Sequence, residues 1–158
     1  MFTSLRSKGF AVKMVGLALL LGASAPVMAG NMSWFQGNYK QALTEAVSRK
    51  VPVVVEFSTD WCGYCKQMDR EVFNRDDVQS FLGTYVALKV DAEKGEGVEL
   101  AKRFAITGYP TFVVVDNTGA ELDRLASAAG AEDFMKEIGN IRACINTLGS
   151  WSARLKAN

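Results

Sequence analysis

Two cysteines separated by two residues, Cys62 and Cys65, are the side chains of this sequence best placed to do chemistry. They follow an apolar, strand-like run and open a helix-like one, so both lie on one face of a first helical turn, close enough to form a disulfide. The free N–H groups and the dipole of a helix N-terminus favour a thiolate at the first position. We therefore expect Cys62 to be an exposed attacking nucleophile and Cys65 a shielded resolving thiol in thiol–disulfide exchange. The alternative is a purely structural disulfide.

The composition leaves few other kinds of chemistry. The 158 residues include no histidine, which excludes imidazole bases, imidazole-activated nucleophiles and histidine metal ligands. Cys144 is the only other cysteine, so a zinc site lacks ligands, and we expect neither a metal nor another cofactor. We interpret Cys144 as a partly buried small hydrophobe near the border of the last helix's apolar face. The alternatives are an intermolecular disulfide and a regulatory thiol.

Residues 1–29 are typical of a cleavable export signal. Three basic residues precede an apolar core that begins at 14–21, and small residues lead to a cleavage site after Ala29. An uncleaved anchor is the alternative, although the apolar stretch is short for a membrane span. Cleavage leaves one domain, residues 30–158, in the periplasm or another oxidising, exported compartment, without stable membrane association. Its 15 basic and 17 acidic residues give a net charge near −2, so nucleic-acid binding is not expected.

The apolar pattern predicts one domain with helices and strands in the order helix, strand, helix, strand, helix, strand, strand, helix. Ser33 and Gln36 fit a capping box for a first helix with an apolar stripe from Phe35 to Ala46. The buried strand 53–57 precedes the cysteine helix 62–73, and Asp76 or Asp77 is the expected cap of a short helical turn.

The second half of the chain predicts a βα unit followed by a hairpin and a last helix. Residues 85–90 form the second strand, and the inner stripe of the next helix runs from Val98 to Ala105. A strand at 111–115, a turn at 116–119 and an edge strand at 120–125 form the hairpin. The last helix carries an apolar face from Phe134 to Leu148. The pattern is βαβ followed by ββα around one mixed sheet.

Glu56 is the first residue that favours catalysis over a structural disulfide. It lies in an otherwise apolar strand, six residues before Cys62, where a buried carboxylate without a partner is costly. We expect a raised pKa and a role as proton acceptor for the Cys65 thiol through water. The alternative is a strand-end carboxylate that faces solvent or pairs with Lys89.

Pro110 and the aromatic residues near the cysteines are the expected substrate-binding residues. Pro110 begins a buried strand, where no N–H is required, and a cis bond to Tyr109 there leaves open backbone for an extended substrate. The alternative is an ordinary trans proline. Trp61 is expected to shield the thiolate and offer apolar surface to peptides, with core packing as its alternative. The loops around Tyr64, Tyr109 and residues 92–97 would set specificity.

Glu56, the run Asp60-Trp61-Cys62-Gly63-Tyr64-Cys65-Lys66 and the later Gly108-Tyr109-Pro110-Thr111 together resemble the thioredoxin superfamily. The resemblance covers roughly residues 33–145. The segment 60–78 is most similar to exported thioredoxin-like proteins, such as the C-terminal periplasmic domains of DsbD-type thiol:disulfide interchange proteins. The resemblance implies an α/β thioredoxin fold, with a central mixed sheet of four to five strands flanked by helices on both faces. It also implies roles for four residues: the redox pair Cys62 and Cys65, the buried acid Glu56 and the cis-proline Pro110.

Two departures from the thioredoxin pattern bear on mechanism. The lysine that accompanies the buried acid in thioredoxin falls on Ala87 here, and Lys89, on the same strand face, is its candidate replacement. The dipeptide Gly63-Tyr64 brings no histidine or cation to stabilise a thiolate, which favours a reductase over a strong oxidase. An isomerase is the next alternative, although this chain has no room for a dimerisation region, and we expect a monomer.

The sequence thus predicts an exported oxidoreductase that acts on protein disulfides or dithiols and exchanges electrons with an upstream thiol partner. The competing hypothesis is a non-catalytic thioredoxin-fold binding or chaperone module with a structural disulfide. The occurrence of Trp61, Glu56 and Pro110 with the cysteine pair argues against that module, because a structural disulfide needs none of them.

Overall fold

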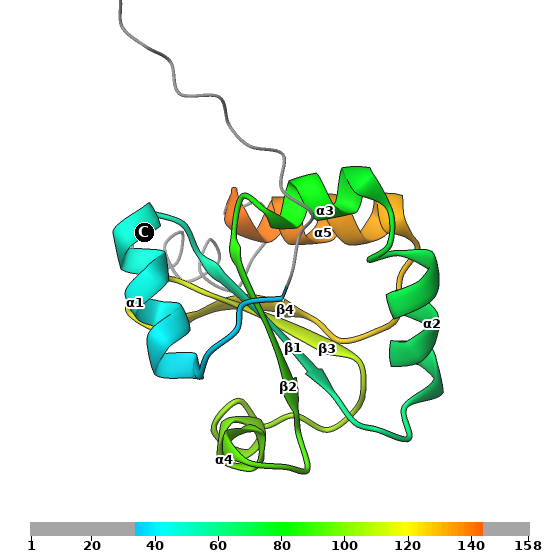
Figure 1. Cartoon of the computed structure of the whole chain (residues 1–158), viewed down its shortest axis with the longest axis horizontal. Coiled ribbons are helices and arrows are strands. Elements are labelled where there is room, and N and C mark those ends of the chain that lie inside the picture. Colours follow the sequence, from blue (N-terminus) through cyan, green and yellow to red (C-terminus); the bar gives the residue numbers. More distant parts are fainter. Residues whose placement is uncertain (1–33, 144–158) are drawn as a thin grey trace, which may run out of the picture.

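The computed structural model describes residues 34–143 and contains the expected helices and strands in the expected order, and the expected short helical turn is present as a further helix, α3 (Asp76–Leu82) (Figure 1). The predicted signal peptide and the boundary at residues 29 and 30 lie outside the described residues. None of the helices within 34–143 is long and apolar enough to cross a membrane. The elements are α1 (Tyr39–Arg49), β1 (Val53–Ser58), α2 (Gly63–Glu71), α3 (Asp76–Leu82), β2 (Val86–Asp91), α4 (Glu96–Arg103), β3 (Thr111–Val115), β4 (Glu121–Leu125) and α5 (Ala131–Arg142).

The four strands form one mixed sheet in the order β2-β1-β3-β4. β1 runs parallel to β2 and antiparallel to β3, and β4 closes the hairpin at the edge. Every residue of β1 is buried, as expected for a strand with neighbours on both sides and helices over both faces. The α/β class and the mixed, four-stranded sheet are therefore confirmed. In the β1–β2 register Glu56 lies opposite Lys89.

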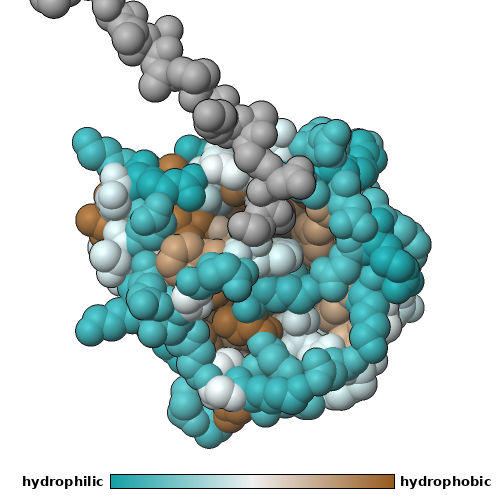
Figure 2. Space-filling view, in the orientation of Figure 1, coloured by the Kyte–Doolittle hydropathy of each residue, from teal (hydrophilic) through white to brown (hydrophobic). Residues whose placement is uncertain are grey.

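Alternation along the strands divides the core into two layers, one on each face of the sheet. One layer packs under α1 and α4 and includes Val55 and Phe57 of β1. The other packs under α2, α3 and α5 and includes Val54 of β1. Since side chains two apart share a face, Glu56 belongs to the second layer. Surface apolar residues on the face seen in Figure 2 form separate areas among hydrophilic ones.

The start of α1 differs from the prediction. Ser33 lies outside the described residues, and Gln36 precedes the helix. The capping box is formed instead by Asn38, whose side chain accepts the N–H of Gln41, while the Gln41 side chain accepts the N–H of Asn38. Phe35 is therefore not part of the helical stripe. It packs against the core from an extended segment and donates its N–H to the carbonyl of Ala87 at 2.7 Å.

The predictions for the helices α3, α4 and α5 have different outcomes. Asp76 and Asp77 lie within the first turn of α3, whose N-cap is Arg75, so neither aspartate is the cap. Ala105 is exposed with a positive φ of 49°, beyond the end of α4, so it does not extend the inner stripe. On α5 the predicted apolar face is buried as far as Ile141, and its continuation toward Leu148 lies outside the described residues. The strand 111–115 and the hairpin that follows it are confirmed.

Candidate active site at the Cys62–Cys65 disulfide

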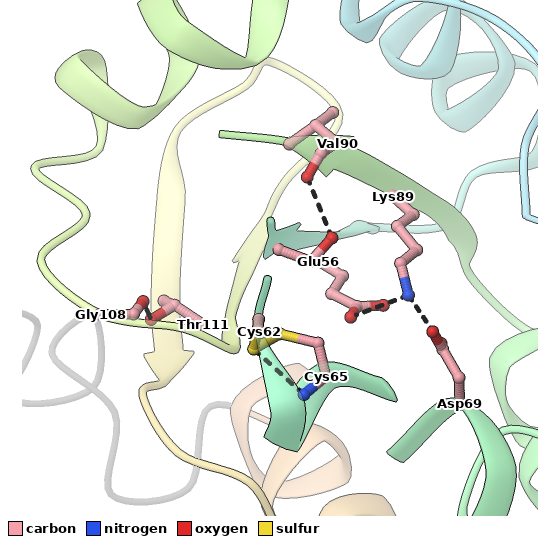
Figure 3. Close-up of a disulfide and its surroundings, with 9 residues drawn as sticks. Glu56, Cys62, Cys65, Asp69, Lys89, Val90, Gly108 and Thr111 are labelled. Carbon is pink, nitrogen blue, oxygen red and sulfur yellow. Dashed lines mark hydrogen bonds and ion pairs between the residues drawn. A yellow bond between two sulfur atoms is a disulfide. The ribbon is translucent and has the colours of Figure 1, made fainter. Parts of the chain in front are cut away.

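Cys62 and Cys65 form a disulfide at the N-terminus of α2, with their Cα atoms 5.3 Å apart. Cys62 is the N-cap of the helix, and its Sγ accepts the backbone N–H of Cys65 at 3.1 Å (Figure 3). A sulfur in this position faces the free N–H groups of the first helical turn, which stabilise negative charge. The local structure thus provides the thiolate-stabilising position that the cysteine spacing predicts.

The two cysteines differ little in exposure. Cys62 is 4% exposed and Cys65 is 2% exposed. The expectation of an exposed Cys62 is therefore wrong for the disulfide form. The reason is that the Cys62 sulfur is turned onto the first turn of α2, where it bonds to the Cys65 sulfur and accepts the Cys65 N–H.

Glu56 is fully buried in the core layer beneath α2. Burial raises the pKa of its carboxyl group to about 7, because a low-dielectric site disfavours the charged form. The nearby Lys89 opposes this increase and Asp69 adds to it. The raised pKa and the pairing with Lys89, two alternatives on the basis of sequence alone, therefore occur together in one buried carboxyl group.

Lys89 links Glu56 to a second acid that sequence reasoning missed. Its Nζ lies 3.2 Å from Oε1 of Glu56 and donates to Oδ1 of Asp69 at 2.6 Å (Figure 3). Lys89, the candidate replacement for the lysine that is missing at position 87, therefore does pair with the buried acid. Asp69 lies four residues after Cys65, on the helix that Cys62 caps. That spacing was the available signal, because residues four apart share a helix face.

A cavity of about 270 Å³ joins the second cysteine to this charge cluster. Cys65, Asp69 and Lys89 all line it. Cys65 therefore borders a polar space whose wall includes the cation that pairs with Glu56. Within residues 34–143, no group of three or more acidic or cysteine side chains is arranged to hold a metal ion.

The segment before β3 contacts the residue before Cys62. The Tyr109–Pro110 bond is cis, and Thr111 Oγ1 donates to the carbonyl of Gly108 at 2.8 Å, which shapes the turn. The Tyr109 ring lies edge-on to the ring of Trp61, with centroids 5.8 Å apart. Tertiary structure thus brings together two of the predicted substrate-binding segments, which are 48 positions apart in the sequence.

The aromatic residue before Cys62 and the one between the two cysteines are both on the surface. Trp61 is 66% exposed and Tyr64 is 67% exposed. Core packing, the alternative for Trp61, is therefore wrong. Tyr64 lies at a second hollow of about 450 Å³, between the outer face of α2 and residues 128–132. Cys144 lies outside the described residues.

The βαβ and ββα units around one mixed sheet, with a Cys-x-x-Cys disulfide at the first helix after β1, define the class of thioredoxin-fold proteins with a redox-capable cysteine pair. The sequence model of the thioredoxin-like domain family matches residues 39–142. The chain therefore belongs to the thioredoxin-like domain family.

Individual relatives carry names from disulfide metabolism. The thiol:disulfide interchange protein DsbD of Yersinia pestis is 31% identical over 96 residues, which cover 58% of this chain and 16% of that protein. The chain thus matches only a small part of DsbD. The disulfide bond reductase DsbH of Chlamydia pneumoniae is 23% identical over 121 residues, covering 70% of this chain and 72% of that protein. The oxidised C-terminal domain of Neisseria meningitidis DsbD is a structural neighbour with 27% sequence identity and a TM-score of 0.55. The match covers 65% of this chain and 92% of that domain's chain.

Proposed function

We propose that this chain is an exported thiol–disulfide oxidoreductase that reduces protein disulfides by cycling Cys62 and Cys65 between dithiol and disulfide. The observation that carries the proposal is a disulfide at the N-terminus of α2 whose Cys65 shares a cavity with Lys89, the ion-pair partner of a buried carboxyl group with a pKa raised to about 7. The names of the relatives, an interchange protein and a disulfide bond reductase, support the same chemistry. A structural disulfide needs no such neighbour.

In the proposed reaction the Cys62 thiolate attacks one sulfur of a substrate disulfide. A Cys62–substrate bond forms, and the other substrate sulfur leaves as a thiolate. The Cys65 thiol then loses its proton and attacks the Cys62 sulfur, so the mixed disulfide breaks and the second substrate thiolate departs. Two electrons pass to the substrate, both leaving thiolates take up protons, and the chain ends in its disulfide form. An upstream dithiol partner returns it to the reduced form.

Glu56 is the proposed acceptor of the Cys65 proton. A group with a pKa of about 7 exchanges protons readily near neutral pH, as a general base must. The route passes through water in the cavity that Cys65 shares with Lys89, the ion-pair partner of Glu56. Uptake of that proton also relieves the cost of a buried negative charge.

The exposed surface beside the disulfide is the proposed binding site for an extended segment of the substrate. Trp61 lies edge-on to Tyr109, which directly precedes Pro110, and Tyr64 is a second exposed aromatic side chain between the two cysteines. We propose that the mature chain, residues 30–158, works as a monomer in the periplasm or an equivalent compartment.

The direct test is dithiothreitol-coupled reduction of insulin by the purified mature chain. Cys62→Ser is expected to abolish turnover, whereas Cys144→Ser, which leaves the pair intact, is expected to retain it. Undiminished turnover by Cys62→Ser would refute the proposal. The direction of electron flow follows from the Cys62–Cys65 potential measured against glutathione. A value of about −270 mV supports a reductase, about −180 mV an isomerase and about −120 mV an oxidase.

A further inference from the structure

Two residues of the loop between β2 and α4 contact the two residues that precede the cysteine pair. The Trp61 Nε1–H donates to Oε2 of Glu93 at 3.0 Å. Lys94 forms ion pairs with both Asp60 and Asp91, the latter at 3.2 Å. Residues more than 30 positions apart in the sequence are thus tied together beside the disulfide.

The loop that carries these two residues is shaped by hydrogen bonds to the side chain and the carbonyl of Asp91. Oδ1 of Asp91 accepts the Glu93 N–H at 2.9 Å, and the Asp91 carbonyl accepts the Lys94 N–H at 3.1 Å. A Cβ at Gly97 would lie 2.0 Å from that carbonyl oxygen, so this close approach requires glycine. Because these bonds do not involve Trp61, the loop presents Glu93 independently of the indole.

Trp61 is held at two points although it is largely exposed. Its indole N–H is bound by Glu93, and its ring lies edge-on to Tyr109. An exposed side chain without such contacts exchanges between rotamers, and binding then carries the entropic cost of ordering it. A tryptophan held in one orientation avoids that cost.

We propose that Glu93 is a positioning residue for protein substrates. By holding the indole N–H it keeps Trp61 against Tyr109 as a preformed apolar surface for the peptide around a substrate disulfide. This proposal rests on the proposed oxidoreductase function and deepens it. A small disulfide that reaches Cys62 without covering Trp61 gains nothing from the surface, so Glu93 should affect protein substrates selectively.

The test compares Glu93→Ala, which removes the acceptor, with Glu93→Gln, which keeps an acceptor oxygen without the charge. Glu99→Ala is the matched control, because Glu99 is exposed on α4 and pairs with Lys102 of the same helix. For insulin, Glu93→Ala is expected to raise KM about 3- to 10-fold with little change in kcat, which corresponds to the entropic cost of ordering one side chain on binding. Glu93→Gln and Glu99→Ala are expected to behave like wild type. With bis(2-hydroxyethyl) disulfide all four proteins should react equally.

The indole N–H resonance of Trp61, assigned by comparison with Trp61→Phe, gives a second readout. Glu93→Ala should shift it upfield, and Glu93→Gln should leave it near its wild-type position. The proposal is overturned if Glu93→Ala changes neither KM for insulin nor the indole resonance. It is also overturned if Glu93→Ala loses as much activity with the small disulfide as with insulin, or if the defect of Glu93→Gln is as large as that of Glu93→Ala. A wild-type chain without Cys62-dependent turnover overturns the oxidoreductase proposal as well, whereas an active wild type with an indifferent Glu93→Ala overturns this one alone.

Discussion

Lys89 Nζ lies 3.2 Å from Oε1 of Glu56, directly across the parallel pairing of β1 and β2. The carboxyl group is fully buried, while the Lys89 side chain is 25% exposed and extends to Asp69 on α2. One cation therefore lies between a buried acid and a partly exposed one. Burial raises the pKa of Glu56, Lys89 lowers it and Asp69 raises it again. The protonation of the proposed proton acceptor thus depends on both strands and on the cysteine helix.

The first prediction concerns the stability of the disulfide form as a function of pH. The carboxyl pKa of Glu56 is about 7 in the folded chain and about 4.5 in the unfolded chain, so the folded state binds more protons between these values. Stability therefore falls as pH rises from about 4.5 through 7, by an amount on the order of 3 kcal/mol, and levels off above that range. Glu56→Gln should remove this fall. Compared with wild type, Tm at pH 8 should be higher in Glu56→Gln, and the difference should shrink toward pH 4.5.

Thermal unfolding followed by circular dichroism across this pH range measures the effect. Glu99→Gln changes an exposed carboxylate and is the control, with a profile expected to follow wild type. Identical profiles for Glu56→Gln and wild type would show that the folded-state pKa of Glu56 is not raised.

The second prediction is that two substitutions shift the Glu56 pKa in opposite directions. Lys89→Met removes the cation that favours the carboxylate, so the pKa should rise further above 7. Asp69→Asn removes a negative charge that disfavours the carboxylate, so the pKa should fall below its wild-type value. Carbon-13 NMR titration of the Glu56 carboxyl group reports each change directly. Shifts in the same direction would contradict the assigned network.

The third prediction distinguishes the two candidate capping boxes of α1. Asn38→Ala should lower the free energy of unfolding by about 1 kcal/mol, because the N–H of Gln41 loses its acceptor. Gln36→Ala loses an exposed bond to the Trp34 carbonyl and should change stability by less than about 0.5 kcal/mol. Urea denaturation measures both. A larger loss for Gln36→Ala would place the cap where the sequence alone suggested it.

Most of the fold could be predicted because its signals are local. The apolar run of β1, the β-branched run of β3 and the turn at 116–119 each reveal an element within a few residues. The misplaced cap shows the limit of this reasoning. Ser33 with Gln36 and Asn38 with Gln41 have the same spacing, and only the packing of Phe35 outside the helix separates them.

The cysteine pair, the acid six residues before it and the proline that directly precedes β3 can be identified from the chain alone, because residue chemistry and spacing reveal them. Tertiary structure decided which residues act on them. Lys89 reaches Glu56 through strand pairing, Asp69 joins through the helix face, and Glu93 holds Trp61 across two loops. It also decided that Cys62 is as buried as Cys65 in the disulfide form. These features depend on side-chain directions and on contacts between distant segments, which spacing along a chain does not encode.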